Sequence, residues 1–358
     1  MTDVFAQLAH KLDQMPNGFP PSPGGTELKI LRKIFSPEEA EMALKIRPIP
    51  ETAEAIAQRV GKSIEEMQTV LDTMVKKGQI GSARMFGNQV YMTVPFVVGI
   101  FEFQLPRLDK ELADLMEEYA PSLMATLGTH APALMRVVPI NVNLKAQQTV
   151  LTYEDVKKMF EKAKAIQVVD CICAKERGLQ GHQCSHTSER CFAFSSHEGA
   201  FDKYRTGRLV SKEEALQIME KCEQEGLVHS TYNVEKGQMF VCNCCSCCCG
   251  ILRGMKQFNA PYLLAKSNFV ASIDEEKCIS CGVCAEERCP MDAIIEQDGL
   301  YKVQPERCIG CGVCTPTCDA QAVTLVRKPE SELDAPPQNV IDWYGKRAES
   351  RGIKIMID

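Results

Sequence analysis

Six cysteines lie within nine residues in the stretch CNCCSCCCG, which runs from Cys242 to Gly250. Free thiols at this density would oxidise readily, so bound metal is the economical explanation. Neighbouring side chains of an extended chain point to opposite sides, so six such cysteines cannot all face one metal. We therefore predict that a subset of these residues binds metal; the candidates are Cys242, Cys244, Cys245, Cys247, Cys248 and Cys249.

Five further cysteines precede this stretch, and none occurs before Cys171. We expect Cys171, Cys173, Cys184 and Cys191 to hold one additional 4Fe-4S cluster, which the nonapeptide could complete or accompany with a second. Zinc and a cluster-free dithiol relay remain alternatives. Cys222 lies on the apolar face of a predicted helix, so we interpret it as a buried core residue.

Two cysteine triplets, each followed by a more distant fourth cysteine, repeat near the C-terminus with a displacement of 30 residues. A short C-x2-C-x2-C loop can turn around an iron-sulfur cube and direct three thiolates at three irons, with the fourth thiolate coming from the other copy. Structural zinc sites would favour two separated C-x2-C pairs. The first copy contains Cys278, Cys281, Cys284 and Cys289, and the second contains Cys308, Cys311, Cys314 and Cys318.

Residues 272–326 resemble the bacterial dicluster ferredoxins. The resemblance implies that Cys278, Cys281, Cys284 and Cys318 bind one 4Fe-4S cluster, and that Cys308, Cys311, Cys314 and Cys289 bind the other. The chain departs from that pattern in the longer spacing between Cys284 and Cys289, and in Asp319, which stands where proline usually follows. Neither departure removes a ligand.

A second resemblance covers about residues 150–326. The order C-x-C, then C and C, then CC-x-CCCG ahead of a ferredoxin module is similar to longer 4Fe-4S proteins of anaerobic bacteria and archaea. It implies an electron-transfer subunit beside flavoproteins or heterodisulfide-reductase-like complexes. The CCG ending also resembles the heterodisulfide-reductase catalytic subunit, but no second CCG follows, so the catalytic role is not carried over.

We expect a cytoplasmic protein. The N-terminus shows no secretion signal, and the longest apolar stretch is far shorter than the roughly 20 residues of a membrane helix. In a reducing compartment, 19 cysteines among 358 residues indicate metal rather than disulfides. A net charge of −6 gives no general attraction to nucleic acid.

Several elements must position these cysteines. Residues 211–226 predict a helix that Ser211 caps and Gly226 ends. The following stretch predicts two strands around Glu235–Gly237 that deliver the nonapeptide at a strand end. Asp298–Gly299 predicts a hairpin turn inside the ferredoxin repeat. The loop charges Lys175, Glu176, Arg177 and Arg190 are interpreted as solvated surface rather than as compensation for cluster charge.

The N-terminal half contains no cysteine. Residues 26–46, 49–61 and 63–80 predict three amphipathic helices, and a hairpin turning at Gly87–Asn88 follows, which resembles the winged helix-turn-helix domains. Residues 26–95 carry ten basic and nine acidic side chains, and the candidate recognition helix opens with Glu65 and Glu66. This charge argues against DNA and for protein docking.

We therefore predict an α+β multidomain chain. Its parts are a winged-helix-like domain (1–95), a connecting region (96–150) with a helix interrupted at Pro121 and a strand at 137–144, a cysteine-rich iron-sulfur domain (151–271), a (βαβ)2 dicluster ferredoxin domain (272–326) and a docking tail (327–358) in which Trp343 and Tyr344 anchor to this chain or to a partner.

The expected function is single-electron transfer between a flavoprotein or ferredoxin and a terminal reductase, through at least two and up to four 4Fe-4S clusters, with no catalytic residue of its own. One alternative is a redox-sensing transcription regulator. The other is a reductase with a special cluster in residues 242–249.

Overall fold

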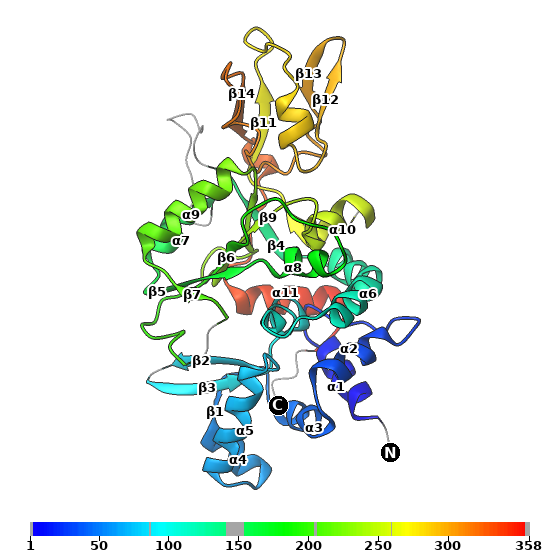
Figure 1. Cartoon of the computed structure of the whole chain (residues 1–358), viewed down its shortest axis with the longest axis vertical. Helices are drawn as coiled ribbons and strands as arrows, with labels where there is room; N and C mark the ends of the chain where they lie inside the picture. The colour runs from blue at the N-terminus through cyan, green and yellow to red at the C-terminus, as the bar shows by residue number, and fades with distance from the viewer. Residues whose placement is uncertain (1–2, 86, 141–153, 204–205, 259, 355–358) are drawn as a thin grey trace.

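The computed structural model describes residues 3–85, 87–140, 154–203, 206–258 and 260–354. Along the longest axis, the N-terminal helices lie at one end, a large sheet lies in the middle and two small sheets lie at the other end (Figure 1). No described helix is both long and apolar enough to cross a membrane.

A seven-stranded sheet forms the centre, in the order β10-β4-β8-β9-β6-β5-β7. Its strands pair antiparallel except for β10, which runs parallel to β4. The strands are β4 (Met135–Val138), β5 (Ala165–Asp170), β6 (Glu189–Ser195), β7 (Arg208–Leu209), β8 (Val228–Tyr232), β9 (Phe240–Cys244) and β10 (Leu264–Ala265). The sheet thus includes β4, from the stretch predicted only to connect; the rest of the strand predicted at 137–144 lies largely outside the described residues.

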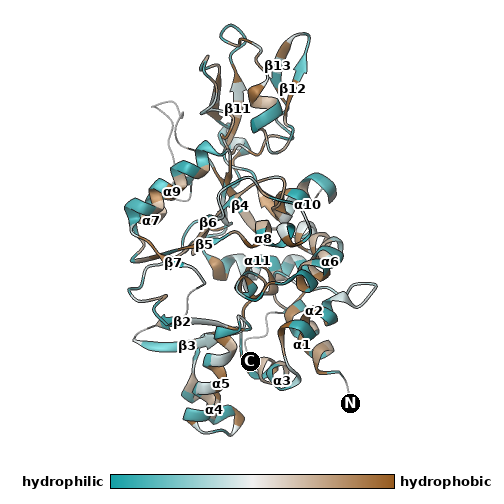
Figure 2. Ribbon diagram, in the orientation of Figure 1, coloured by the Kyte–Doolittle hydropathy of each residue, from teal (hydrophilic) through white to brown (hydrophobic). Residues whose placement is uncertain are grey.

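Helices α7 (Val156–Glu161) and α9 (Lys212–Gln224) pack on one face of this sheet. Their apolar residues join strand residues such as Val168 and Phe192 in one buried cluster. The two helices alternate hydrophilic and hydrophobic residues along their length (Figure 2). The predicted boundaries of α9 are confirmed, because the Ser211 side chain accepts a hydrogen bond from the Glu214 amide and Gly226 follows with a positive φ.

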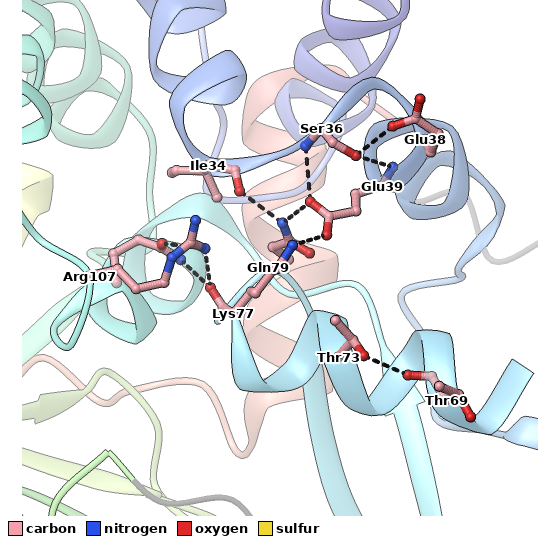
Figure 3. A network of polar contacts seen from close by, with 10 residues as sticks. Ile34, Ser36, Glu38, Glu39, Thr69, Thr73, Lys77, Gln79 and Arg107 are labelled. Carbon is pink, nitrogen blue, oxygen red and sulfur yellow. Dashed lines mark hydrogen bonds and ion pairs between the residues drawn. The ribbon is translucent and has the colours of Figure 1, made fainter.

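The N-terminal region contains more helices than predicted. These are α1 (Val4–Asp13), α2 (Thr26–Ile34), α3 (Pro37–Lys45), α4 (Ala53–Val60) and α5 (Ile64–Lys76). The prediction of one helix over 26–46 is wrong, because the chain breaks at Phe35 and Ser36 begins a new helix. The Ser36 hydroxyl accepts from the Glu39 amide (3.2 Å), while the Glu39 carboxylate accepts from the Ser36 amide (2.9 Å) (Figure 3).

The predicted hairpin is present as β2 (Gly81–Met85) and β3 (Asn88–Met92), and β3 also pairs with β1 (Glu51–Thr52). Asn88 already pairs with Met85, so it belongs to β3 and not, as predicted, to the turn. Gln79, just before the hairpin, donates to the carbonyl of Ile34 (2.8 Å) and so fastens the hairpin to α2 (Figure 3).

Helix α6 (Lys110–Thr129) runs straight through the position where an interruption was predicted. Pro121 removes one backbone donor but does not end the helix. Buried residues on both sides of it, including Tyr119, Leu123 and Leu127, hold the helix against the core, so packing outweighs the lost hydrogen bond.

The ferredoxin-like repeat forms two small antiparallel sheets. One pairs β11 (Phe269–Ile273) with β14 (Val323–Arg327), and the other pairs β12 (Ile294–Gln297) with β13 (Leu300–Val303). Asp298 and Gly299 both have positive φ, which confirms the predicted turn. The first copy contains a short helical segment at Cys284–Arg288, whereas the second forms only turns after Cys314.

The last helix, α11 (Val340–Arg351), folds back onto the body of the protein, between the central sheet and the N-terminal helices (Figure 1). Trp343 is fully buried, and its indole N–H donates to the carbonyl of Ala133 (2.8 Å). The sequence left open whether Trp343 anchors the tail to this chain or to a partner, and in the structure it packs against this chain.

Candidate metal centres

Strand alternation places three cysteines on one face of the central sheet. Cys191 on β6 and Cys242 and Cys244 on β9 are half-buried, whereas their neighbours Phe192, Val241 and Asn243 are buried. This pattern follows from the two-residue period of a strand. Cys171 and Cys173 follow the end of β5 at the start of α8 (Ile172–Leu179), and Cys249 precedes α10 (Gly250–Phe258).

These six thiols form a closed ring in which each interacts with two others. In order around the ring they are Cys171, Cys173, Cys249, Cys244, Cys242 and Cys191. The ring joins three separate segments of the chain, and only the fold brings these segments together.

The acidity of the thiols alternates around this ring. Contact with Cys173 lowers the pKa of both Cys171 and Cys249 well below the usual thiol value, and contact with Cys191 lowers the pKa of Cys242 to about 6. The neighbours behave oppositely: contact with these acidic thiols raises the pKa of Cys173, Cys244 and Cys191 well above the usual value. Thiols this close to one another share protons, so the ring favours thiolates, the form that binds metal.

A second group contains four thiols. The sulfurs of Cys184, Cys245, Cys247 and Cys248 all lie within 4.8 Å of one another, with 3.8 Å between Cys184 and Cys245 and 3.6 Å between Cys247 and Cys248. A tetrahedral ion about 2.3 Å from each thiolate separates the sulfurs by roughly 3.8 Å. The donors therefore fit a metal, and their close approach suits a single ion more directly than a cube whose thiolates bind different irons.

Arg190 links the two groups. It is fully buried, and its guanidinium donates to the sulfurs of Cys184 and Cys245 at 3.5 Å each. Cys171 of the ring also hydrogen-bonds to it. Burial opposes a charge here, but the pKa of Arg190 is raised by the surrounding thiols, so the guanidinium stays protonated. The interpretation of Arg190 as solvated surface charge is wrong.

The structure regroups the predicted ligands. Cys171, Cys173 and Cys191 lie together as predicted, but Cys184 joins the second group and not theirs. The nonapeptide supplies both groups, with three cysteines to each. Cys222 belongs to neither group and is fully buried on α9, and burial raises the pKa of its thiol to about 12.

The eight C-terminal cysteines lie near enough for their charges to interact, and their division into two ligand sets of four stays a prediction. Cys278, Cys281 and Cys318 act electrostatically on Cys284. Cys314 is influenced by Cys308, Cys311 and Cys289, and also by Cys284. The two remote cysteines have equivalent surroundings, because Cys289 accepts from the amide of Ala293 (3.1 Å) and Cys318 from that of Ala322 (3.2 Å). Such N–H to sulfur bonds stabilise cluster-bound thiolates, so these residues also fit the implied group.

The two C-terminal groups differ in exposure. Cys308, Cys311 and Cys314 are buried, whereas Cys281 is exposed and Cys278 and Cys284 are half-buried. The buried group lies toward the central sheet: the amide of Ile140, just after β4, donates to the carbonyl of Cys311 (3.0 Å). The exposed group therefore faces solvent, and the buried group adjoins the rest of the protein.

Comparisons with protein-family models, with curated proteins and with solved structures find no match to this chain. The case for its function therefore depends on its own residues.

Proposed function

We propose that the protein is an iron-sulfur electron-transfer protein. One observation supports the proposal: the free thiols are concentrated, with six in the ring, four within 4.8 Å of one another, and eight in the C-terminal repeat that the ferredoxin resemblance divides into two sets of four. Clustered thiols without disulfides are typical of metal ligands rather than of a disulfide framework.

The C-terminal groups would hold two 4Fe-4S clusters through the ligand sets implied by the ferredoxin resemblance. When bound, such clusters accept and release single electrons at potentials set by burial and by hydrogen bonds to sulfur. The middle groups would hold further metal. The chain contributes amide donors at Cys289 and Cys318 and a buried cation at Arg190.

The arrangement of the thiol groups suggests where redox partners would bind. Cys281 is exposed and follows β11, one of the strands at the end of the molecule farthest from the N-terminal helices, so a flavoprotein or ferredoxin could approach this group closely (Figure 1). The buried group of Cys308, Cys311 and Cys314 lies between it and the central sheet, where the remaining thiols are. A terminal reductase would then exchange electrons with the middle groups.

Iron and acid-labile sulfide counting on anaerobically purified protein tests this function. About eight irons per chain would restrict clusters to the C-terminal module, and a higher count would place iron in the middle groups as well. We expect Cys311→Ser and Cys247→Ser to lower the metal content, whereas Cys222→Ser leaves it unchanged. Colourless protein that carries zinc or bare thiols at the C-terminal triplets would contradict the proposal.

A further inference from the structure

A cavity of about 2720 Å³ lies between the central sheet and the N-terminal half of the chain. Its walls come from α1, from the β2–β3 hairpin, from β5, β6 and β9, and from the chain around Tyr344. Apolar side chains provide most of the lining, including Phe194, Phe240 and Met239. The volume exceeds the roughly 300–1,000 Å³ of a usual small-molecule site.

All six thiols of the ring line this cavity. Strand alternation puts Cys191, Cys242 and Cys244 on the face of the sheet opposite α9, and the lining continues around the sheet to Phe194 and to Lys162 at the end of α7. Of the four-thiol group, only Cys245 reaches the cavity. A molecule bound in the cavity could therefore reach the ring. A centre that only relays electrons would not need such access.

The lining is cationic although the protein is acidic. Ten lysine and arginine residues line the cavity against three acidic residues, Glu102, Asp170 and Glu235, whereas the whole chain carries a net charge of −6. Five of the ten are exposed and make no ion pair among the described residues; they are Lys45, Lys76, Arg84, Lys162 and Lys236. Cations kept without partners around an apolar cavity attract a negatively charged ligand.

We propose that this cavity binds a large anionic molecule that has an extended apolar or aromatic body and a phosphate or carboxylate group. The anionic group would lie among the unpaired cations, and the body would lie against the apolar walls toward the thiol ring. The inference rests on the proposed function only in that the ring holds metal. According to this proposal, the thiol ring exchanges electrons with a small molecule bound in the cavity. The ring would then be more than a structural or relay centre.

Flavin mononucleotide and riboflavin test the charge requirement, because they share one aromatic body and differ in a phosphate. Equilibrium dialysis against anaerobically purified, iron-loaded protein should show flavin mononucleotide binding at least tenfold more tightly than riboflavin. Raising the salt from 50 to 500 mM should reduce the preference, because salt screens exposed charges. Equal affinities, or no binding of either compound, would overturn the proposal.

Matched variants locate the site. The double substitution Arg84→Gln and Lys236→Gln should weaken flavin mononucleotide binding at least fivefold and leave riboflavin unchanged. Ala193→Trp, which adds bulk to the cavity face of β6, should weaken both. Lys302→Gln, an exposed cation on β13 outside the cavity, is the control and should change neither. Binding that all these variants retain would place the ligand elsewhere and overturn the proposal.

Iron content measured on the same samples separates this inference from the proposed function. A full iron content without tighter binding of flavin mononucleotide than of riboflavin would contradict the cavity proposal alone. Charge-selective binding by protein that cannot be loaded with iron defeats the electron-transfer proposal and leaves the anion site established.

Discussion

A single buried guanidinium, that of Arg190, contacts sulfurs from two thiol groups at once. A charge in this position stabilises nearby negative charge strongly, because little water screens it. It should therefore make reduction of any metal centre held there easier.

The substitution Arg190→Gln should lower the reduction potential of the middle centres. Hydrogen bonds to charged groups contribute about 1.5–3 kcal/mol, which corresponds to roughly 60–130 mV for one electron. Redox titration followed by electron paramagnetic resonance measures the shift. Arg190→Lys keeps the charge and should shift the potential less. Unchanged potentials in both variants at full iron content would contradict this role.

Glu102 offers a test of pH dependence. Burial, more than its negative neighbours, raises the pKa of this carboxyl to about 8 in the folded protein, above its usual value near 4.5. The folded state then binds the proton more tightly than the unfolded state, so the stabilisation is complete below about pH 4.5 and is lost as the pH rises through 8.

The substitution Glu102→Gln should remove this dependence. The unfolding temperature of the variant, relative to that of the unchanged protein, should rise steadily between pH 5 and pH 8 in thermal unfolding measured without oxygen. Glu349→Gln, at an exposed position on α11, should show a constant difference. A constant difference for Glu102→Gln as well would show that its carboxyl is not perturbed.

At the scale of elements, α11 stabilises the fold through the buried side chain of Trp343. Trp343→Ala should destabilise the protein by about 3–5 kcal/mol, because it removes a fully buried aromatic side chain and its hydrogen bond. Denaturant unfolding measures this change. Ile341→Ala in the same helix, where 83% of the side chain is exposed, should change stability by about 0.5 kcal/mol or less. Similar losses from both substitutions would contradict the anchoring role.

The elements that local signals specify were predictable from the sequence. Ser211 and Gly226 mark the ends of α9, and Asp298–Gly299 marks a hairpin, since each depends on neighbours a few residues away. The break at Ser36 carried the same kind of signal, a capping serine followed by Pro37 and Glu39, and could have been found. Pro121 misled because tertiary packing overrides a local helix-breaking preference.

The grouping of the middle thiols was not predictable in this way. Cys184 and Cys245 are 61 residues apart and meet only because β6 pairs with β9. For the C-terminal cysteines a family resemblance implies a pairing, whereas no repeat indicates the partners of Cys184. The one usable signal was the C-x-C spacing of Cys242 and Cys244, which on a strand puts both thiols on the same face.

At the scale of the whole molecule, Arg288 connects the C-terminal module to the central domain. Its guanidinium donates to the carbonyls of Glu223 and Gln224 at the end of α9 (2.9 Å each) and to that of Val313 (3.0 Å). A cation at a helix C-terminus also complements the helix dipole. Arg288 thus holds the buried cysteine group close to the central sheet.

The substitution Arg288→Ala should loosen this connection. Hydrogen exchange at residues 223–227 and 284–288 should increase severalfold, because the module loses its two hydrogen bonds from Arg288 to the end of α9 and one internal bond to Val313. Arg307→Ala is the matched control, since among the described residues the guanidinium of Arg307 has polar contacts with Met291 and Asp292, both inside the module. Exchange that is equal in the two variants would show that Arg288 does not set the placement of the module.

The position of α11 in the chain bears on how the protein is made. Every cysteine precedes this helix, and Arg347 within it donates to the carbonyls of Pro16 (3.2 Å) and Leu127 (2.7 Å) far upstream. Because the ribosome synthesises the polypeptide from its N-terminus, all the cysteines emerge before α11, the helix that packs against the rest of the protein. We expect the cellular assembly machinery to insert the metal centres during that interval, before α11 has packed onto the protein.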